Sequence, residues 1–179
     1  MIGNNIKKHF TTVTHHRNEV IKNCARAGIL VQGLRHDLSK YSPSEFISSC
    51  KYYQGTRSPN EAEREDKGYS EAWMHHKGRN RHHFEYWTDY NPETRRMEPV
   101  KMPMRYVIEM FCDRVAASKI YMGDSYNDAA PLAYFERGRA TRSIHPKTSR
   151  LLEFLLTMLA EKGEDYTFAY LRHIKDRNY

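Results

Sequence analysis

The chain has 179 residues, a net charge of +7 and an isoelectric point near 9.3. Charged residues make up 28% and aromatic residues 12%, which excludes a disordered chain and predicts one folded domain over residues 1–179. No apolar run approaches the roughly 20 residues of a membrane helix, and the first residues lack the apolar segment of a signal peptide, so we expect a cytoplasmic protein without a membrane partner.

The excess of basic residues favours an anionic partner. A small phosphorylated substrate, such as a nucleotide, fits this charge best, and nucleic acid is a less favoured partner. The basic residues are scattered along the chain, and no block of five or six like charges is present. A solvated basic surface therefore explains the charge as well.

The cysteines and histidines narrow the kind of site. Cys24, Cys50 and Cys112 lie far apart without a Cys-x-x-Cys motif, which predicts reduced thiols and argues against a zinc finger. Ten histidines is an unusual number, and six of them form the adjacent pairs His15-His16, His75-His76 and His82-His83.

The first predicted helix covers residues 5–27. Apolar residues and two histidines recur along it at three- and four-residue spacing, which predicts one buried face. His9 and His16 lie on this face, whereas His15 points about 100° away. Gly28 ends or bends the helix.

A second helix is expected over residues 29–39, with His36-Asp37 near its C-terminal end. Neighbouring side chains on a helix diverge by about 100°, so an imidazole and a carboxylate placed there can hold a metal from two sides. The short Asp37 carboxylate can also bridge a second metal. A surface histidine and aspartate that close a helix by chance would show the same dipeptide.

The middle of the chain mixes helices and loops. Ser42-Pro43-Ser44-Glu45 predicts a helix that runs to residue 53, with Ser42 as the cap and Glu45 closing a capping box. We expect a surface loop over 55–67, a helix over 70–77 and an irregular segment over 88–103.

The C-terminal part is also predicted to be helical. A helix over 103–121 carries Asp113 on its apolar stripe, where an unpaired carboxylate would be costly. Further helices are expected over 131–137, 146–161 and 165–177, and Gly163 should end the second of these. No segment alternates with a period of two, so the predicted fold class is all-α.

Four side chains with metal-ligand chemistry thus occupy interior positions on three predicted helices. They are His16, His36, Asp37 and Asp113. Imidazole nitrogens and carboxylate oxygens suit Fe, Mn, Zn or, with more oxygen, Mg. Against a metal, a buried histidine can simply form hydrogen bonds, and Asp113 can pair with an arginine. His9 is better interpreted as a core histidine.

A second histidine group lies between Trp73 and Trp87. If the helix continues past Gly78, His76 and His83 share a face with both tryptophans and can bind a second metal bridged by Asp37. Because Gly78 leaves the register open, His75 with His82 is the alternative pair. An aromatic, basic surface helix would explain the same residues without a metal.

The order His16, His36-Asp37, Asp113 resembles the HD-domain superfamily of metal-dependent phosphohydrolases. The segment His36-Asp37-Leu38-Ser39-Lys40 is similar to its His-Asp-x-Gly-Lys variant, and residues 112–117 are similar to its closing Ala-Asp-Arg-x-x-Ala helix. The resemblance covers about residues 8–120. It implies an HD-like helical bundle with a metal-site core over about 5–121 and extra helices over about 146–177.

This resemblance also implies an activity. HD subgroups with extra histidines bind two or three metals, and some use two irons to activate oxygen. The chain also resembles a bacterial and phage family of unknown function, which supplies no activity.

We therefore expect a phosphohydrolase that acts on a nucleotide or another small phosphate ester with one or two divalent metal ions. Asp37 and Lys40 are the predicted catalytic residues. Lysine and arginine charges suit phosphate binding, although a solvated surface position is the better explanation for any one of these residues taken alone. The predicted substrate-binding residues are Lys40, Lys77, Arg79 and Arg81. The alternatives are an HD-fold di-iron oxygenase and a basic helical nucleic-acid-binding module that uses the Trp73–Trp87 stretch.

Overall fold

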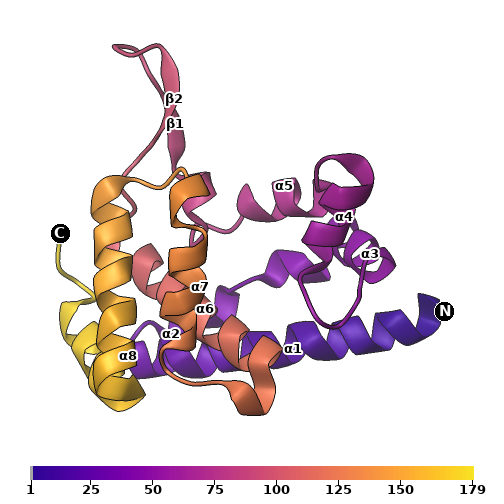
Figure 1. Cartoon of the computed structure of the whole chain (residues 1–179), viewed down its shortest axis with the longest axis horizontal. Helices are drawn as coiled ribbons and strands as arrows, with labels where there is room; N and C mark the ends of the chain where they lie inside the picture. Colours follow the sequence, from indigo (N-terminus) through magenta and orange to yellow (C-terminus); the bar gives the residue numbers. More distant parts are fainter. Residues whose placement is uncertain (1) are drawn as a thin grey trace.

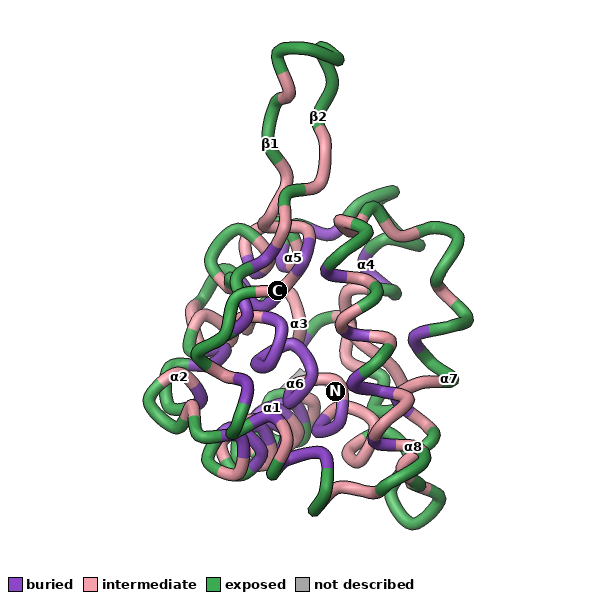
Figure 2. The backbone as a smooth tube through the Cα atoms, turned by 90° about the vertical axis from the view of Figure 1, so that its left-hand side faces the viewer, coloured by how far each residue is buried: buried purple, intermediate pink, exposed green. Residues whose placement is uncertain are grey.

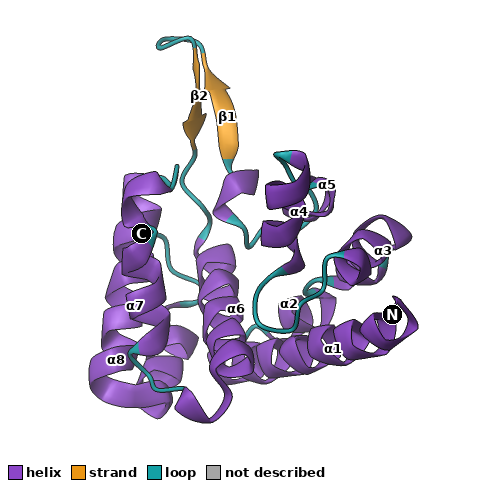
Figure 3. Ribbon diagram, turned by 45° about the vertical axis from the view of Figure 1, so that its right-hand side comes forward, coloured by secondary structure: helices purple, strands orange, loops and turns teal. Residues whose placement is uncertain are grey.

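The structure, a computed structural model, describes residues 2–179, with side chains described from Asn5 onward. Within these residues, eight α-helices form the body and one β-hairpin projects from it (Figures 1 and 3). The helices are α1 (Ile2–Ala27), α2 (Leu30–Arg35), α3 (Pro43–Lys51), α4 (Pro59–Lys67), α5 (Glu71–Lys77), α6 (Met104–Met122), α7 (Ala130–Arg137) and α8 (Pro146–Ile174). The strands are β1 (Thr88–Asn91) and β2 (Arg96–Pro99). The predicted all-α class is confirmed in that the fold is predominantly helical.

The hydrophobic core lies where α1, α6 and α8 pack together, with α7 against α6 and α8. The fully buried side chains there include Ile108, Phe111, Leu152, Leu155 and Leu159. Figure 2 shows buried backbone in this interior and an exposed hairpin. Each such side chain contributes roughly 1.5–3 kcal/mol of burial free energy, which fixes α6 against α1. This packing brings Asp113 of α6 to His16 of α1.

The close approach of α2 to α1 depends on Gly33. A Cβ atom at this position would lie 2.5 Å from the Cβ of Cys24 in α1, so only glycine fits there. The contact anchors α2 directly before His36 and Asp37.

The predicted helix over 29–39 is too long. The helix α2 ends at Arg35, and His36 caps it by donating its backbone N–H to the Gly33 carbonyl. Asp37 adopts a left-handed conformation with φ 53° before a short 3₁₀ helix, η1 (Leu38–Tyr41). Such a backbone costs an L-residue about 1–2 kcal/mol, and aspartate tolerates it better than most residues. The His36-Asp37 pair therefore occupies a sharp turn rather than a helix face.

The prediction of a loop over 55–67 is wrong, because this segment contains α4. Pro59 is the first residue of the helix, where its fixed φ and missing N–H are favourable, and Gly68 ends it with φ 82°. The sequence of α4 does not predict a helix, because Ala62 is its only buried apolar residue and no apolar stripe is present. The helix is held to its neighbours by the buried Glu63, which accepts hydrogen bonds from Ser48 and Ser70.

The segment 88–103, predicted to be irregular, contains the β-hairpin. Antiparallel pairing runs from Thr88 opposite Pro99 to Asn91 opposite Arg96. Because the hairpin projects from the helices, neither face of its strands is buried. The sequence therefore lacks the apolar–polar alternation by which a half-buried strand is recognised.

The ends of the other elements largely follow the predictions. The helices expected over 5–27, 103–121 and 131–137 are present as α1, α6 and α7. Gly163 interrupts α8 with φ 78° and ψ 175°, at the position predicted to end a helix. Ser42 precedes α3, as predicted, but makes no side-chain cap bond there, so the predicted capping box is wrong. Among the described residues, no helix combines the length and apolarity needed to cross a membrane.

Candidate metal centre

The first group of metal-ligand atoms joins α1, the turn after α2, and α6. One ligand atom each from His16, His36, Asp37 and Asp113 lies within 4.8 Å of the others. Asp113 Oδ1 lies 3.0 Å from His16 Nε2 and 3.5 Å from His36 Nε2. Asp37 Oδ2 lies 3.1 Å from His36 Nε2 and 4.0 Å from His16 Nε2. The structure thus brings the four predicted residues to one point.

The second group is formed by Asp37 and three histidines from α5 and the segment after it. Its members are Asp37, His76, His82 and His83. Asp37 Oδ1 lies 3.2 Å from His76 Nε2 and 3.5 Å from His82 Nε2. His76 Nε2 and His83 Nε2 are 2.9 Å apart. The helix α5 stops at Lys77, so His82 and His83 reach the site from a turn, which allows both neighbours to face Asp37.

The two oxygens of Asp37 face different groups. Oδ2 lies with His16, His36 and Asp113, whereas Oδ1 lies with His76 and His82. The left-handed backbone of Asp37 turns its side chain into the protein, where the residue is only 1% exposed. A carboxylate in this position has the geometry of a bridge between two ions.

The spacing of these donor atoms matches coordination of a metal better than hydrogen bonding between the side chains. Metal–nitrogen bonds of about 2.0–2.1 Å place neighbouring ligand atoms about 2.9–3.4 Å apart in octahedral or tetrahedral geometry. Several distances in both groups fall in or close to that range. Five of these buried atoms nevertheless make no hydrogen bond of good geometry: Nε2 of His16, His36 and His82, and both oxygens of Asp37, of which Oδ2 lies 2.6 Å from the Lys40 ammonium. Buried polar atoms that converge without bonding one another are the arrangement that a bound cation satisfies.

Two buried glutamates fix the orientation of three histidine rings. Glu109 of α6 lies 2.9 Å from His36 Nδ1 and 3.3 Å from His82 Nδ1. Glu45 of α3 lies 2.8 Å from His76 Nδ1. An Nδ1–H that donates to a carboxylate leaves Nε2 with a free lone pair, which in all three rings faces Asp37. A carboxylate behind the histidine is the usual outer partner of a metal ligand.

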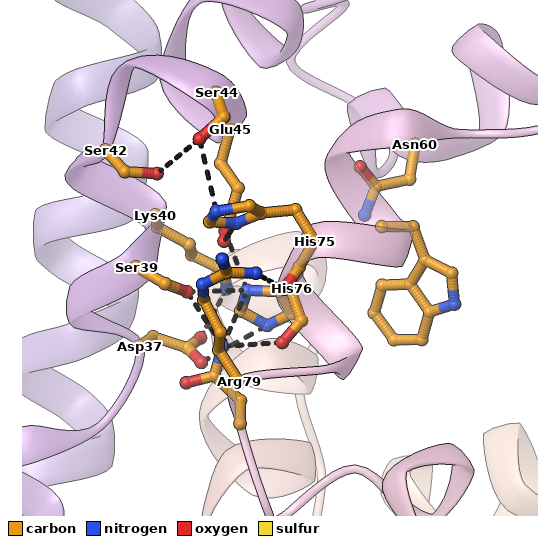
Figure 4. Close-up of polar contacts among 12 residues, drawn as sticks. Asp37, Ser39, Lys40, Ser42, Ser44, Glu45, Asn60, His75, His76 and Arg79 are labelled. Carbon is orange, nitrogen blue, oxygen red and sulfur yellow. Dashed lines mark hydrogen bonds and ion pairs between the residues drawn. The ribbon is translucent and has the colours of Figure 1, made fainter.

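His75 belongs to this outer layer rather than to the metal groups. Its Nδ1 contacts Glu45 at 2.5 Å, and its Nε2 lies 3.2 Å from the Ser44 hydroxyl. Figure 4 shows Glu45 between His75 and His76. Of the two predicted pairs, the structure brings His76 and His83 to Asp37; from the alternative pair it brings His82 and leaves His75 outside.

The electrostatics of the groups are dominated by buried carboxylates. Burial opposes the charged form of Asp37, but the positive charges of His36 and Lys40 outweigh it and hold the pKa of this carboxyl well below its usual range. Burial likewise opposes protonation of His36, but the carboxylates of Asp37, Asp113 and Glu109 raise the pKa of this imidazole well above its usual range. The site therefore draws positive charge to itself.

Two other candidate ligands, His16 and His83, have lowered pKa values, which favours the neutral imidazole that binds a metal. Burial lowers the pKa of His16, and it lowers the pKa of His83 well below its usual range with help from His82 and His76. His9 is different: its pKa falls to about 4 through burial and the charge of Lys40. Its ring packs against Phe46 and Tyr53, and it joins neither metal-ligand group, in line with the predicted core role.

A cavity of about 190 Å³ opens onto the first group and part of the second. His16, His76, His83 and Asp113 line it, together with Lys40. The Lys40 ammonium lies 2.6 Å from Asp37 Oδ2, and its side chain is 31% exposed. Lys40 therefore contacts the Asp37 carboxylate and lines the cavity as well.

The other predicted substrate-binding residues do not line this cavity. Arg79 and Arg81 line a separate groove, and Lys77 lines neither space. The four predicted substrate-binding residues therefore do not share one space: the turn after α5 directs Arg79 and Arg81 to the groove and returns to the cavity at His83. Only Lys40 is placed beside the candidate ligands.

Sequence reasoning missed three residues of the site or gave them another role. Glu109 precedes Asp113 by one helical turn, and this spacing places both on one face of α6. Glu45 was interpreted as a helix-capping residue. His82 was named only as a partner of His75, because a continuous helix cannot present His82 and His83 to the same point.

Comparison with known proteins gives one result. Neither the curated proteins nor the solved structures contain a match to this chain. The family described as "Family of unknown function (DUF5662)" matches residues 5–158, a range that contains every residue of the two metal-ligand groups. The chain therefore belongs to this family of unknown function, DUF5662.

Proposed function

We propose that the protein is a metal-dependent phosphohydrolase that acts on a small phosphate ester and uses two divalent ions bridged by Asp37. The observation that carries the proposal is the position of Asp37, with one oxygen in each histidine group and Lys40 beside it at the cavity. The order His16, His36-Asp37, Asp113, which resembles the HD superfamily, points to the same chemistry.

The donor set indicates which residues would hold the ions. His16, His36 and Asp113 would bind one ion with Asp37, and His76, His82 and His83 the other. Five imidazoles and two carboxylates suit Fe, Mn or Zn better than Mg, which prefers oxygen. When bound, such ions lower the pKa of a coordinated water and polarise a phosphoryl oxygen.

The chain's own residues would then orient and neutralise the substrate. Lys40 carries a charge at the cavity wall, where it can pair with a phosphate oxygen and stabilise the negative charge that develops during hydrolysis. Burial opposes the charged form of Lys40, but Asp37 and Asp113 raise its pKa, so the ammonium stays charged. Arg57 also lines the cavity, but its guanidinium is paired with the Glu65 carboxylate at 2.6 Å, so Lys40 is the residue proposed to meet the phosphate.

The size of the cavity favours a small ester over a nucleotide. Ligand pockets for larger molecules usually measure about 300–1,000 Å³, whereas this cavity measures about 190 Å³. Its wall includes the aromatic residues Tyr53, Trp73 and Tyr121. A phosphate on a compact organic group matches this combination of the Lys40 ammonium and an aromatic wall.

A di-iron oxygenase is the second candidate. The specific observation in its favour is the high share of imidazole among the candidate ligands, which suits iron. A substrate that carries phosphate or carboxylate would fit the cavity for either reaction.

A paired assay separates the two reactions. Manganese-loaded protein is screened anaerobically against phosphomonoesters, nucleotides and phosphodiesters, and iron-loaded protein is screened for substrate-dependent oxygen uptake. The variants are Asp37→Asn and Lys40→Met, with Lys147→Met, an exposed lysine of α8, as the matched control.

Our proposal predicts release of phosphate or alcohol that both site variants abolish and the control retains. Lys40→Met should keep its metal content, since Lys40 is not a ligand. Oxygen uptake coupled to substrate without ester cleavage would replace the proposal with an oxygenase. Salt-sensitive RNA or DNA binding that survives Asp37→Asn, without either activity, would favour the binding module.

A further inference from the structure

A second concave space, separate from the cavity with Lys40, is lined in part by His82 and Glu109. This groove has a volume of about 600 Å³. Its floor includes His82 and Glu109, and the cavity with Lys40 shares no lining residue with it. The His36–Glu109–His82 contacts therefore stand between the groove and the candidate metal ligands.

Basic side chains from four parts of the chain line the groove. They are Arg35 at the end of α2, Arg79 and Arg81 after α5, Arg105 in α6 and Lys175 at the end of α8. The carboxylates in the lining are Glu109 and Asp176. The groove therefore carries an excess of positive charge, although its residues are scattered in the sequence.

The four arginines are not neutralised by the protein. Among the residues that the structure describes, none of them has a carboxylate within salt-bridge distance. Both carboxylates of the groove are already engaged, Glu109 with His36 and Gln32, and Asp176 with Lys175. Guanidinium groups that line one concave surface without a carboxylate partner are suited to bind an anion with several oxygen atoms.

We propose that this groove is a separate binding site for the phosphate chain of a small polyphosphate, either inorganic tripolyphosphate or a nucleoside triphosphate. The excess of positive charge matches an anion with three or four negative charges. The volume lies in the range of about 300–1,000 Å³ that is usual for small-ligand pockets. Tyr106, which lines the groove and packs against Trp87, offers an aromatic surface for a base.

A ligand in this groove would also lie beside Glu109, which orients two candidate metal ligands. Glu109 forms part of the groove and contacts Nδ1 of His36 and His82. A polyanion bound beside Glu109 would therefore act on the residue that orients two candidate ligands. The binding itself does not depend on the proposed hydrolase activity, because no residue of the first metal group lines the groove.

Isothermal titration calorimetry on the full-length chain tests the proposal. Metal is stripped from the protein and the chelator is removed by dialysis, so that phosphate–metal contacts cannot contribute. The probes are sodium tripolyphosphate, ATP, AMP and a 20-nucleotide RNA. The variants are Arg35→Ala/Arg105→Ala in the groove, Arg96→Ala/Arg150→Ala as a charge-matched surface control, and Lys40→Met in the other cavity. Circular dichroism checks that each variant is folded.

We expect one site that binds tripolyphosphate and ATP and binds AMP more weakly. Loss of two charged donors should weaken binding by about tenfold or more in the groove variant, with little change in the surface control or Lys40→Met. Equal affinities for tripolyphosphate and ATP would show that only phosphates are bound, and stronger binding of ATP would add a base contact at Tyr106.

Three results would overturn the proposal. The first is no binding of either polyphosphate. The second is binding that falls in Lys40→Met or in the surface control as much as in the groove variant. The third is RNA binding at least tenfold tighter than ATP with the same arginine dependence, which would make the groove part of a nucleic-acid surface.

Discussion

The Nδ1 atom of His36 lies 2.9 Å from Oε1 of Glu109, and this contact leaves Nε2 of His36 facing Asp37. The same glutamate lies 3.3 Å from His82 Nδ1, so one carboxylate orients a ring in each metal-ligand group. Loss of such an outer partner typically weakens metal binding by about 10–100-fold. We expect Glu109→Gln to do so for both ions.

Competition with a fluorescent chelator measures this change in metal affinity. Glu161→Gln, an exposed glutamate of α8, is the matched control and should bind metal as the wild type does. Unchanged metal affinity in Glu109→Gln would show that Glu109 does not orient the ligands of either ion.

The histidines after Trp73 should differ in their effect on the second ion. His82→Ala removes a nitrogen that lies 3.5 Å from Asp37 Oδ1, whereas His75→Ala removes a ring that contacts Glu45 and Ser44. We expect elemental analysis to find about one ion per chain in His82→Ala and about two in His75→Ala. Loss of the second ion in both variants would restore the alternative pair of His75 with His82, and loss in His75→Ala alone would exclude His82 as a ligand.

Gly33→Ala tests how the turn with His36 and Asp37 is anchored. The new methyl group would lie 2.5 Å from the Cβ of Cys24, so α2 must move away from α1. Overpacking of this kind costs about 1–3 kcal/mol, which a denaturant titration would detect. Metal affinity should fall as well, because α2 ends directly before His36. A variant as stable as the wild type would show that α2 does not need this close approach.

The pH dependence of stability should report on Glu164 of α8. Burial opposes its charged form, but Lys119 and Arg26, each at 2.5 Å, lower its pKa below the ordinary 4.5. A lowered folded-state pKa gives stability that is complete above the unfolded-state pKa and is lost as the pH falls through the folded-state pKa. Glu164→Gln should therefore lower the free energy of unfolding by about 1–2 kcal/mol at pH 7.

This difference from the wild type should shrink as the pH falls below about 4, as measured by urea unfolding at a series of pH values. A difference that stays constant over the whole range would mean that the charge of Glu164 does not contribute to stability.

The first metal-ligand group could be predicted from the sequence because its signals are local. His16 and Asp113 lie on helical stripes that are otherwise apolar, and such stripes are buried regardless of the details of the fold. The His36-Asp37 dipeptide stood out for its chemistry, although its backbone did not follow the helix expected there. A left-handed aspartate leaves no pattern in the sequence, because it depends on the packing of α2 against α1.

The second group and the positions of the arginines depend on where the chain turns. His82 and His83 both face Asp37 only because α5 ends at Lys77. Arg79 and Arg81 lie in the same short segment, yet they line the groove and not the cavity with Lys40. Sequence spacing gives neighbours on a regular helix, but it does not give directions within an irregular turn.

Anomalous X-ray diffraction from crystals of manganese- or iron-loaded protein tests the central claim most directly, because it locates the ions without reference to activity. We predict two peaks about 3.5–4 Å apart, one on each side of the Asp37 carboxylate. The first should lie within about 2.0–2.3 Å of His16, His36 and Asp113 ligand atoms, and the second at the same distance from His76, His82 and His83. A single peak would contradict the bridging role of Asp37, and crystals without a peak at these residues would contradict the metal centre itself.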